Sequence, residues 1–283
     1  MKKYIALGAL LAGCGGDATT NTGTVNVSVW GEPFIESTAG IGPAMGMEPG
    51  FVDGWTVRFT KFLVSVGQVS VNATGGTAST LPALRVYNLH GTNGPVRLGS
   101  LPNVPARRQD QVSFRIAPPT ADSTAGNSGA TAGDITAMRD GRFSLWVEGT
   151  ATKPGRATPI TFRWTFGNTV DYTRCELEGA FGVAVPTGGA ADVQLTIHGD
   201  HFFYDRVGEG ASLRFEDIAA ADRNMDNMVT LEELAMVDLT TLPRDRYDPS
   251  GAPNVNTLRD FMNVLTTTVG HFNGEGECTV TRR

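Results

Sequence analysis

The chain has few basic residues and no long apolar run, and each shortage excludes a class of protein. Its 283 residues include 23 Lys and Arg against 29 Asp and Glu, which gives a formal net charge of −6 at pH 7. Nucleic acids attract basic surfaces, so this acidic balance, without a basic patch that contains aromatic residues, predicts no nucleic-acid partner. The apolar run at residues 4–11 is too short to cross a bilayer as a helix.

The common catalytic motifs are also missing. The sequence contains no G-x-S-x-G, no phosphate-binding glycine loop and no H-E-x-x-H. We therefore predict a protein that is not an enzyme. One alternative is an enzyme that acts on envelope polysaccharide, because the fold, and not the sequence spacing, brings together the two carboxylates of a glycosidase.

Short segments of alternating apolar and polar residues predict a mainly β fold. With 35 Gly, 15 Pro and 8% aromatic residues, the composition is typical of a loop-rich β protein that still has a core. Val25, Val27 and Val29 alternate with polar residues, and similar segments lie at residues 84–89, 111–116, 143–147, 160–166, 172–177 and 193–197. About eight strands without helical periodicity before residue 208 predict an antiparallel β-sandwich over residues 24–206.

Two features of this region refine the prediction. At residues 55–71 the alternation changes phase. The apolar residues Val57 and Phe59 are at odd positions, Phe62 is at an even position, and Val69 is at an odd position again. These changes predict β-bulges or a pair of strands. Residues 118–140 are rich in Gly, Ala, Ser and Thr, and they predict a loop.

The segments YNLHG (residues 87–91) and VSFRIAP (residues 112–118) loosely resemble parts of the Ig-like or transthyretin-like sandwiches of bacterial surface lipoproteins of unknown function. This resemblance implies a sandwich fold. It implies no activity, because one fold carries many functions.

The N-terminus resembles a bacterial lipoprotein signal peptide. Lys2 and Lys3 precede the apolar run, which ends in the lipobox-like sequence Leu11-Ala-Gly-Cys14. The resemblance implies that residues 1–13 are removed and that Cys14 carries acyl chains, which anchor the protein to a membrane. Residues 14–23 would then form a flexible tether. An ordinary secretory signal with an incidental cysteine is the alternative.

The predicted export has two consequences. No Asp directly follows Cys14, and in the enteric-type sorting rule this resembles a protein of the outer membrane, so we predict a cell-envelope location. An exported chain also meets an oxidising compartment, so the two remaining cysteines, Cys175 and Cys278, are predicted to form a disulfide. Two reduced, buried thiols are the alternative.

Residues 222–233 place oxygen atoms where a twelve-residue calcium loop needs them, and this spacing resembles an EF-hand. The predicted ligands are Asp222, Asn224 and Asp226 at positions 1, 3 and 5, the Met228 carbonyl at position 7, Thr230 at position 9 and Glu233 at position 12. Asn227 occupies position 6, where Gly is usual because φ is positive. We therefore expect Ca²⁺ to bind weakly, on the order of 10⁻⁴ to 10⁻³ M, as a structural ion.

Helical periodicity surrounds this loop and predicts a small C-terminal helical EF-hand module over residues 207–283. Apolar residues at helical spacing flank the loop at 215–219 and 231–235. A third helix begins at a cap over Thr257 and Asp260, and its predicted buried stripe is Leu258, Phe261, Met262, Leu265, Val269 and Phe272. Residues 248–256 imitate part of a second calcium loop. Arg259 stands where the closing Glu belongs, so we predict a single ion site.

Three histidines form the remaining candidate site. His198, His201 and His271 can bind zinc or copper if the fold gathers them, and Glu32 or Glu36 can join, with Asp205 nearby. The alternative is a set of polar residues at the junction between sheet and helices, because sequence spacing alone does not show convergence.

The sequence as a whole predicts a lipid-anchored envelope protein with a structural Ca²⁺. Its function is predicted to be that of a non-enzymatic binding or scaffold module, with the membrane as partner through Cys14 and an unidentified envelope protein or glycan as a further partner. The alternative function is that of a periplasmic protein that binds zinc or copper through the histidines.

Overall fold

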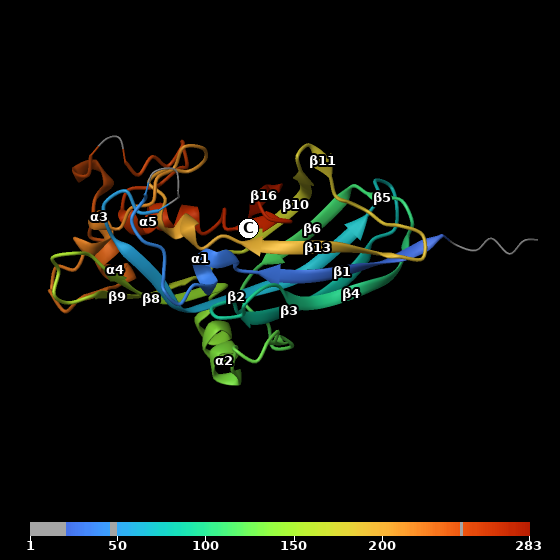
Figure 1. The fold of residues 1–283 in the computed structure, drawn as a ribbon, viewed down its shortest axis with the longest axis horizontal. Helices are drawn as coiled ribbons and strands as arrows, with labels where there is room; N and C mark the ends of the chain where they lie inside the picture. The colour runs from blue at the N-terminus through green and yellow to red at the C-terminus, as the bar shows by residue number, and fades with distance from the viewer. Residues whose placement is uncertain (1–20, 46–49, 244–245) are drawn as a thin grey trace, which may run out of the picture.

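The structure is a computed structural model that describes residues 21–45, 50–243 and 246–283. Cys14, the predicted signal peptide and most of the predicted tether lie outside these residues. Thr22 and Gly23, predicted as tether, belong to the first strand, β1. The fold is mainly β (Figure 1). Within the described ranges, every helix is too short or too polar to span a membrane.

The smaller main sheet has the strand order β15-β13-β1-β4. Its strands are β1 (Thr22–Trp30), β4 (Val96–Pro105), β13 (Ala190–Ile197) and β15 (Gly270–Phe272). The alternation predicted for β1 is confirmed, because Val25, Val27 and Val29 are buried and their neighbours are half-buried. The prediction of a wholly antiparallel fold is wrong for β1 and β13, which pair in parallel. A parallel pair needs a long crossover, and the chain that builds the larger sheet supplies it.

Among the described residues, the larger sheet contains ten strands. They are β2 (Thr56–Asn72), β3 (Ser79–Asn88), β6 (Gln111–Ile116), β7 (Thr124–Ala125), β8 (Leu145–Thr152), β9 (Ile160–Phe166), β10 (Val170–Leu177), β11 (Ala180–Phe181), β14 (Met228–Val229) and β16 (Glu277–Arg282). A small sheet pairs β5 (Arg108–Gln109) with β12 (Val183–Ala184). All six alternating segments listed from the sequence overlap strands, with Leu89, Phe143 and Ser144 just outside them, and β4 is a strand that the sequence did not indicate.

The phase changes predicted at residues 55–71 are β-bulges in the single long strand β2. The pairing register of β2 shifts between Phe59 and Lys61 against β8, and between Gly67 and Val69 against β3. Gln68 has a positive φ of 49° at the second shift. The bulges turn apolar residues at both odd and even positions into the interior. The single strand β2 therefore buries the apolar residues on both sides of each phase change.

The curled sheets enclose one large core that continues into the C-terminal part of the chain. Buried residues from Val25 in β1 to Phe272 in β15 belong to the same cluster. The segment predicted as a helical module also supplies β14, β15 and β16 to the two main sheets. The structure therefore does not set residues 207–283 apart as a separate helical unit.

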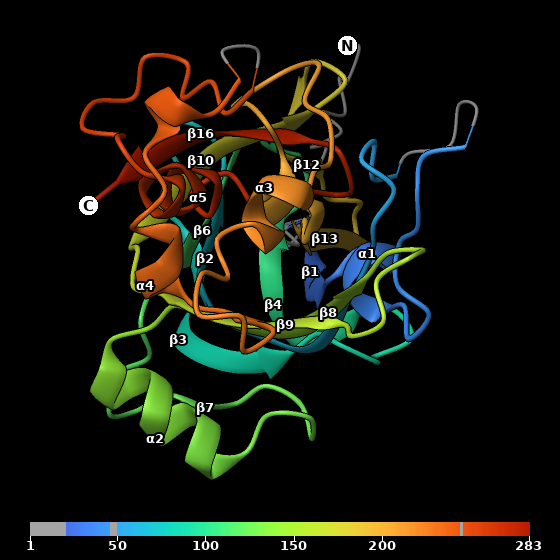
Figure 2. The ribbon, with the colours of Figure 1, turned by 90° about the vertical axis from the view of Figure 1, so that its left-hand side faces the viewer.

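The helices are short and lie mostly at one end of the sheets (Figure 2). They are α1 (Glu32–Glu36), α2 (Ala132–Gly141), the 3-10 helix η1 (Asp200–Phe203), α3 (Glu216–Ala219), α4 (Leu231–Leu234), the 3-10 helix η2 (Leu239–Thr241) and α5 (Leu258–Leu265). The prediction of a loop at 118–140 is wrong for α2, which begins at a capping box between Thr131 and Asp134. A Lys61–Asp134 ion pair of 2.6 Å holds α2 against β2.

The last helix begins where the sequence predicted and ends earlier. Thr257 and Asp260 form the predicted capping box, and the whole predicted stripe is buried. The helix stops at Leu265 because Thr266, Thr267 and Thr268 follow, β-branched residues whose hydroxyls bond back to the carbonyls three residues earlier. His271 and Phe272 therefore lie in strand β15, and the prediction that the helical stripe continues to Phe272 is wrong.

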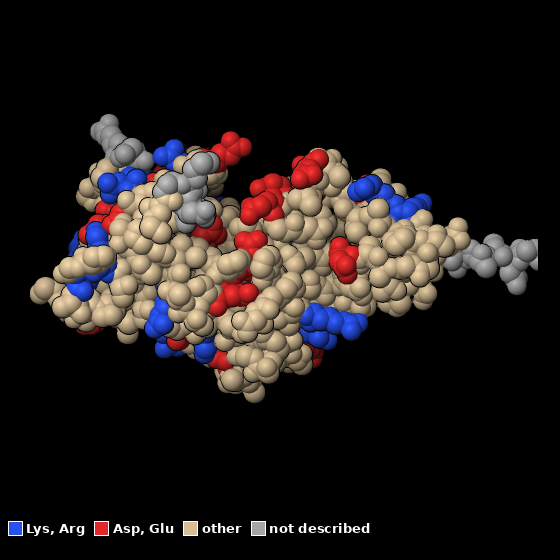
Figure 3. All heavy atoms as spheres, viewed as in Figure 1, with Lys and Arg blue, Asp and Glu red and all other residues tan. Residues whose placement is uncertain are grey.

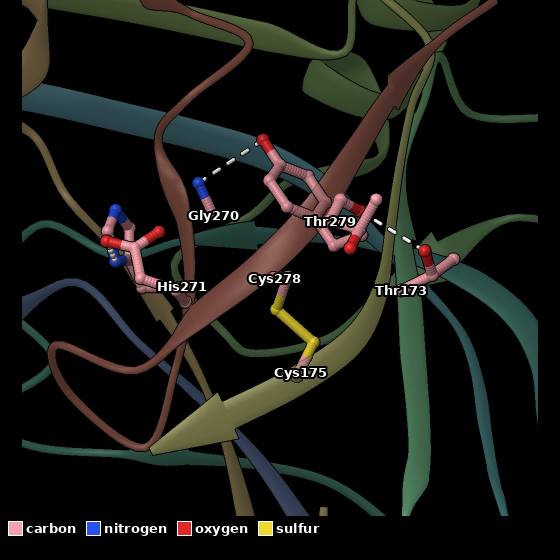
Figure 4. Close-up of a disulfide and its surroundings, with 8 residues drawn as sticks. Thr173, Cys175, Gly270, His271, Cys278 and Thr279 are labelled. Carbon is pink, nitrogen blue, oxygen red and sulfur yellow. Dashed lines mark hydrogen bonds and ion pairs between the residues drawn. A yellow bond between two sulfur atoms is a disulfide. The ribbon is translucent and has the colours of Figure 1, made fainter. Parts of the chain in front are cut away.

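The predicted disulfide is present. Cys175 of β10 and Cys278 of β16 are joined across an antiparallel pair of strands, 103 residues apart in the sequence (Figure 4). The bond fixes one arm of the β15–β16 hairpin, whose other arm carries His271. It therefore attaches the C-terminal strands to the body of the protein.

Replacing both cysteines with Ala should lower the free energy of unfolding by about 2–5 kcal/mol, because a crosslink over so long a loop restricts the unfolded chain. Urea titration under non-reducing conditions measures the change. The double variant should also be insensitive to a reductant that destabilises the wild type. An unchanged urea midpoint in the variant would contradict the prediction.

Candidate metal centre

Three histidines that are far apart in the sequence meet at the end of the smaller sheet. His198 directly follows β13, His201 lies in η1, and His271 is the middle residue of β15. The register pairs Thr196 with His271. Because side chains two residues apart share a face of a strand, His198 and His271 lie on the same face, opposite to the core residue Ile197.

The three imidazoles are close enough to share one ion. One ligand nitrogen from each lies within 4.8 Å of the others. The ring centroids are 4.1 Å apart for His198 and His271, 5.2 Å for His201 and His271, and 5.3 Å for His198 and His201. Nitrogens bound to a tetrahedral zinc at about 2.05 Å lie about 3.3 Å apart, so small side-chain movements would complete the site.

The hydrogen bonds of His201 fix its tautomer. Its Nδ1 lies 2.8 Å from the Thr268 hydroxyl. That hydroxyl donates its own proton to the Leu265 carbonyl, so it accepts from Nδ1–H. The lone pair of His201 is then on Nε2. Metal-binding histidines are oriented in this way by a partner on the other ring nitrogen.

His271 carries a nitrogen without a partner. Its Nδ1 is buried and makes no hydrogen bond, and the nearest carboxylate oxygen, from Glu277, is 3.9 Å away. Buried polar atoms of native proteins are almost always paired, so the unpaired Nδ1 is available to a ligand.

The surroundings keep two of the histidines neutral. Burial lowers the pKa of His201 well below its ordinary value, and His271 and His198 add smaller effects in the same direction. Burial, then His198, lowers the pKa of His271 to about 4, against the opposing effect of Glu275 and Asp200. Neutral imidazole is the form that binds a metal.

Carboxylates surround the histidines on the side toward solvent. Glu32 Oε2 lies 3.6 Å from His198 Nε2, and Asp200 Oδ1 lies 3.8 Å from His198 Nδ1. Glu32, His198 and Glu275 form a second group whose ligand atoms all lie within 4.8 Å of one another. Asp200 also accepts a hydrogen bond from Tyr204, whose ring packs on His201.

The sequence identified some of these neighbours and missed others. Glu32 joins the histidines, as considered, whereas Glu36 accepts hydrogen bonds from Thr92 and the Gly94 amide. Asp205 is paired with Arg214 at 2.8 Å. Glu275 was not a candidate, although the Asn-Gly dipeptide before it is a hairpin signal that would have placed it beside His271.

The predicted calcium loop is held by hydrogen bonds between its own residues. Asn227 has a φ of 63°, the left-handed conformation expected at position 6. Asp222 accepts hydrogen bonds from the amides of Asp226 and Asn227, and Asp226 accepts one from Met228. The flanking helices α3 and α4 have only one turn each.

Glu233 is held by the helix that it begins. Its Oε2 accepts hydrogen bonds from the amide and hydroxyl of Thr230, both at 2.9 Å. The carboxylates of Asp222, Asp226 and Glu233 accordingly do not gather within 4.8 Å of one another. Glu233 Oε1 is buried and makes no hydrogen bond, which leaves it for an ion.

The larger sheet supports the predicted calcium loop. Strand β14 within the loop pairs in parallel with β9, and Trp164 donates a hydrogen bond of 2.9 Å to the Val229 carbonyl. The second loop-like segment uses Asp248 to hold the Ser250 amide at 2.8 Å. A sheet edge therefore supports the loop, where an EF-hand normally uses a partner loop.

Comparisons with protein-family models, with curated proteins and with solved structures found no match to this chain. Any proposal for the function therefore rests on the sequence and on the chemistry of the site.

The metal-free protein should lose stability as the pH falls from about 6.5 to about 4.5, because the unfolded chain binds protons that buried His201 and His271 do not. Each neutral histidine contributes up to about 1.4 kcal/mol per pH unit in this window. Urea titrations in a chelator measure the slope, and His271→Gln should reduce it. A constant midpoint from pH 7 to 4.5 would show that the histidines titrate normally.

Proposed function

We propose that the protein binds a divalent transition metal, zinc or copper, through His198, His201 and His271. The observation that carries this proposal is the convergence of three buried imidazoles, each with a ligand nitrogen within 4.8 Å of the other two. Imidazole nitrogen is a preferred ligand of both metals. Alkaline-earth ions prefer oxygen, so the cluster favours a transition metal over calcium or magnesium.

Burial favours a role in binding over one in catalysis. The three histidines are 4%, 8% and 8% exposed, and Tyr204 packs over His201. Three nitrogens fill three of the four positions around a tetrahedral ion. A substrate would have to reach the remaining position through side chains that are already in contact. We therefore propose that the protein holds or delivers the metal and does not use it in a reaction.

Replacing His201 or His271 with Ala should weaken zinc binding by at least about a hundredfold, because even residues that only orient metal ligands contribute 10- to 100-fold to affinity. Competition with a chromogenic chelator measures the affinity. His90→Ala is the matched control, because His90 is the fourth histidine and bonds to the Ile35 carbonyl outside the cluster. Equal zinc affinity in the control and the cluster variants would exclude the proposed site.

We also propose that residues 222–233 bind a structural Ca²⁺. The positive φ of Asn227 and the free Oε1 of Glu233 support this role. The ion would attach α3 and α4 to β9 through the loop, and the sheets would form the body of a β-sandwich. Lipidation of Cys14, an outer-membrane location and an envelope protein or glycan as partner belong to the same proposal, on the strength of the lipobox-like sequence.

Calcium at ten to a hundred times its Kd should raise the free energy of unfolding by roughly 1.4–2.7 kcal/mol, because it binds the native state only. Thermal melts with calcium and with a chelator measure the gain, and Asp222→Ala should abolish it. The same melts on His271→Ala serve as the control, since that variant keeps the loop. Superimposable curves with and without calcium would refute the site.

A further inference from the structure

We propose that Glu32, Glu275 and His198 form an outer cation position through which a divalent transition metal reaches the buried histidines. This inference rests on the proposed function, since it describes how that site is loaded. The three ligand atoms lie within 4.8 Å of one another, and they come from α1, the end of β13 and the β15–β16 turn.

The exposure of these groups falls in the order in which an entering ion would meet them. Glu275 is exposed, the Glu32 side chain is 19% exposed, and the His198 side chain is 4% exposed. His201 and His271, which share the inner group with His198, are both buried. Oxygen ligands at the surface therefore lead to nitrogen ligands in the interior.

The outer carboxylates carry negative charge that no basic side chain neutralises. In the part of the chain that the structure describes, no ion pair joins Glu32, Asp200 or Glu275 to a Lys or Arg. Glu275 and Asp200 instead lie close enough to Glu32 to repel it. Figure 3 shows acidic side chains gathered over the middle of this face, with Lys and Arg toward the ends. Such a field attracts cations and repels anions.

Close packing holds Glu32 at this position. Gly199, between His198 and Asp200, packs against α1 so tightly that an added Cβ would lie 2.5 Å from Ile35 Cγ1. Glu32 itself has a φ of 54°, in the left-handed region that a Glu rarely adopts. Backbone strain of this kind is retained where the surroundings fix it, commonly at functional sites.

The shared residue determines how the two positions work together. His198 belongs to both groups, and a neutral imidazole has only one lone pair. One ion at a time can therefore use it. To move inward, an ion held by Glu32, Glu275 and His198 exchanges its two carboxylates for the nitrogens of His201 and His271, and His198 Nε2 gives up its 3.4 Å contact with the Gly274 carbonyl when it binds the ion. The outer position should thus determine how fast the metal binds, while the protein still binds one ion at these two positions.

Zinc uptake by the full chain tests this inference. Wild type, Glu32→Gln and Glu275→Gln are mixed with zinc in a stopped-flow instrument, and a fluorescent zinc indicator follows the free ion. Each variant should load roughly tenfold more slowly at low salt, because electrostatic steering commonly raises association rates by a factor of 10 or more. The difference should shrink as salt screens the charges. Asp140→Asn, which removes a charge on the exposed end of α2, should load like the wild type.

A second variant isolates the outer position. His201→Ala combined with His271→Ala should still bind one zinc weakly, and adding Glu32→Gln should abolish that binding; circular dichroism verifies the fold of each protein. If the wild type binds no zinc, the proposed function fails. If the wild type binds zinc while Glu32→Gln and Glu275→Gln load at its rate, the histidine site stands and the outer position is refuted.

Discussion

The pairing of β15 with β13 is the constraint on which the histidine cluster depends. It places His271, from the end of the chain, opposite Thr196 and beside His198. A slip of one residue would turn His271 to the opposite face of the strand, because side chains alternate. Both strands of the pair are held in place. Strand β13 pairs with β1, and the hairpin that carries β15 is attached by the disulfide between β16 and β10. The same strand β1 leads directly into α1 and Glu32. The three histidines and the carboxylates beside them are thus positioned by one end of the smaller sheet.

Three imidazoles in contact are a poor way to build a stable core. Burial removes them from water, and a proton on any one of them disfavours protonation of the others, as the lowered pKa values of His201 and His271 record. An apolar triplet of similar size would avoid these costs. The arrangement is understandable if a cation supplies the charge that the histidines cannot carry. Perturbed titratable groups gather at functional sites for this reason.

The sequence predicted those features that depend on local pattern. The parity changes at Phe59 and Gly67 predicted the bulges of β2, and Thr257 with Asp260 predicted the start of α5. The local pattern gave the wrong end for α5. The apolar stripe continues from Leu258 to Phe272, but three threonines end the helix before the stripe does.

The missed features depend on contacts between distant segments. The meeting of His198 with His271 follows from a strand register, which no spacing in the sequence specifies. Helix α2 was missed because its faces are weakly amphipathic, although Thr131 and Asp134 form a cap that the sequence displays. The spacing that predicts a calcium loop is visible in the sequence, but the support of this segment by β9 is not, because the pairing of Val229 with Phe162 is equally non-local.

The two candidate ion sites are linked by rigid packing. Val229 in the loop accepts a hydrogen bond from Trp164, and the Trp164 ring lies 6.1 Å from Phe203, which shares η1 with His201. All of these side chains are buried in the same core. Coupling between sites requires an element with two arrangements that both ligands bias, and a close-packed aromatic core offers one arrangement only. The packing therefore fixes the distance between the sites without making one ion sense the other. Under the proposed function, each ion would stabilise its own surroundings, and the shared core would join the two sites.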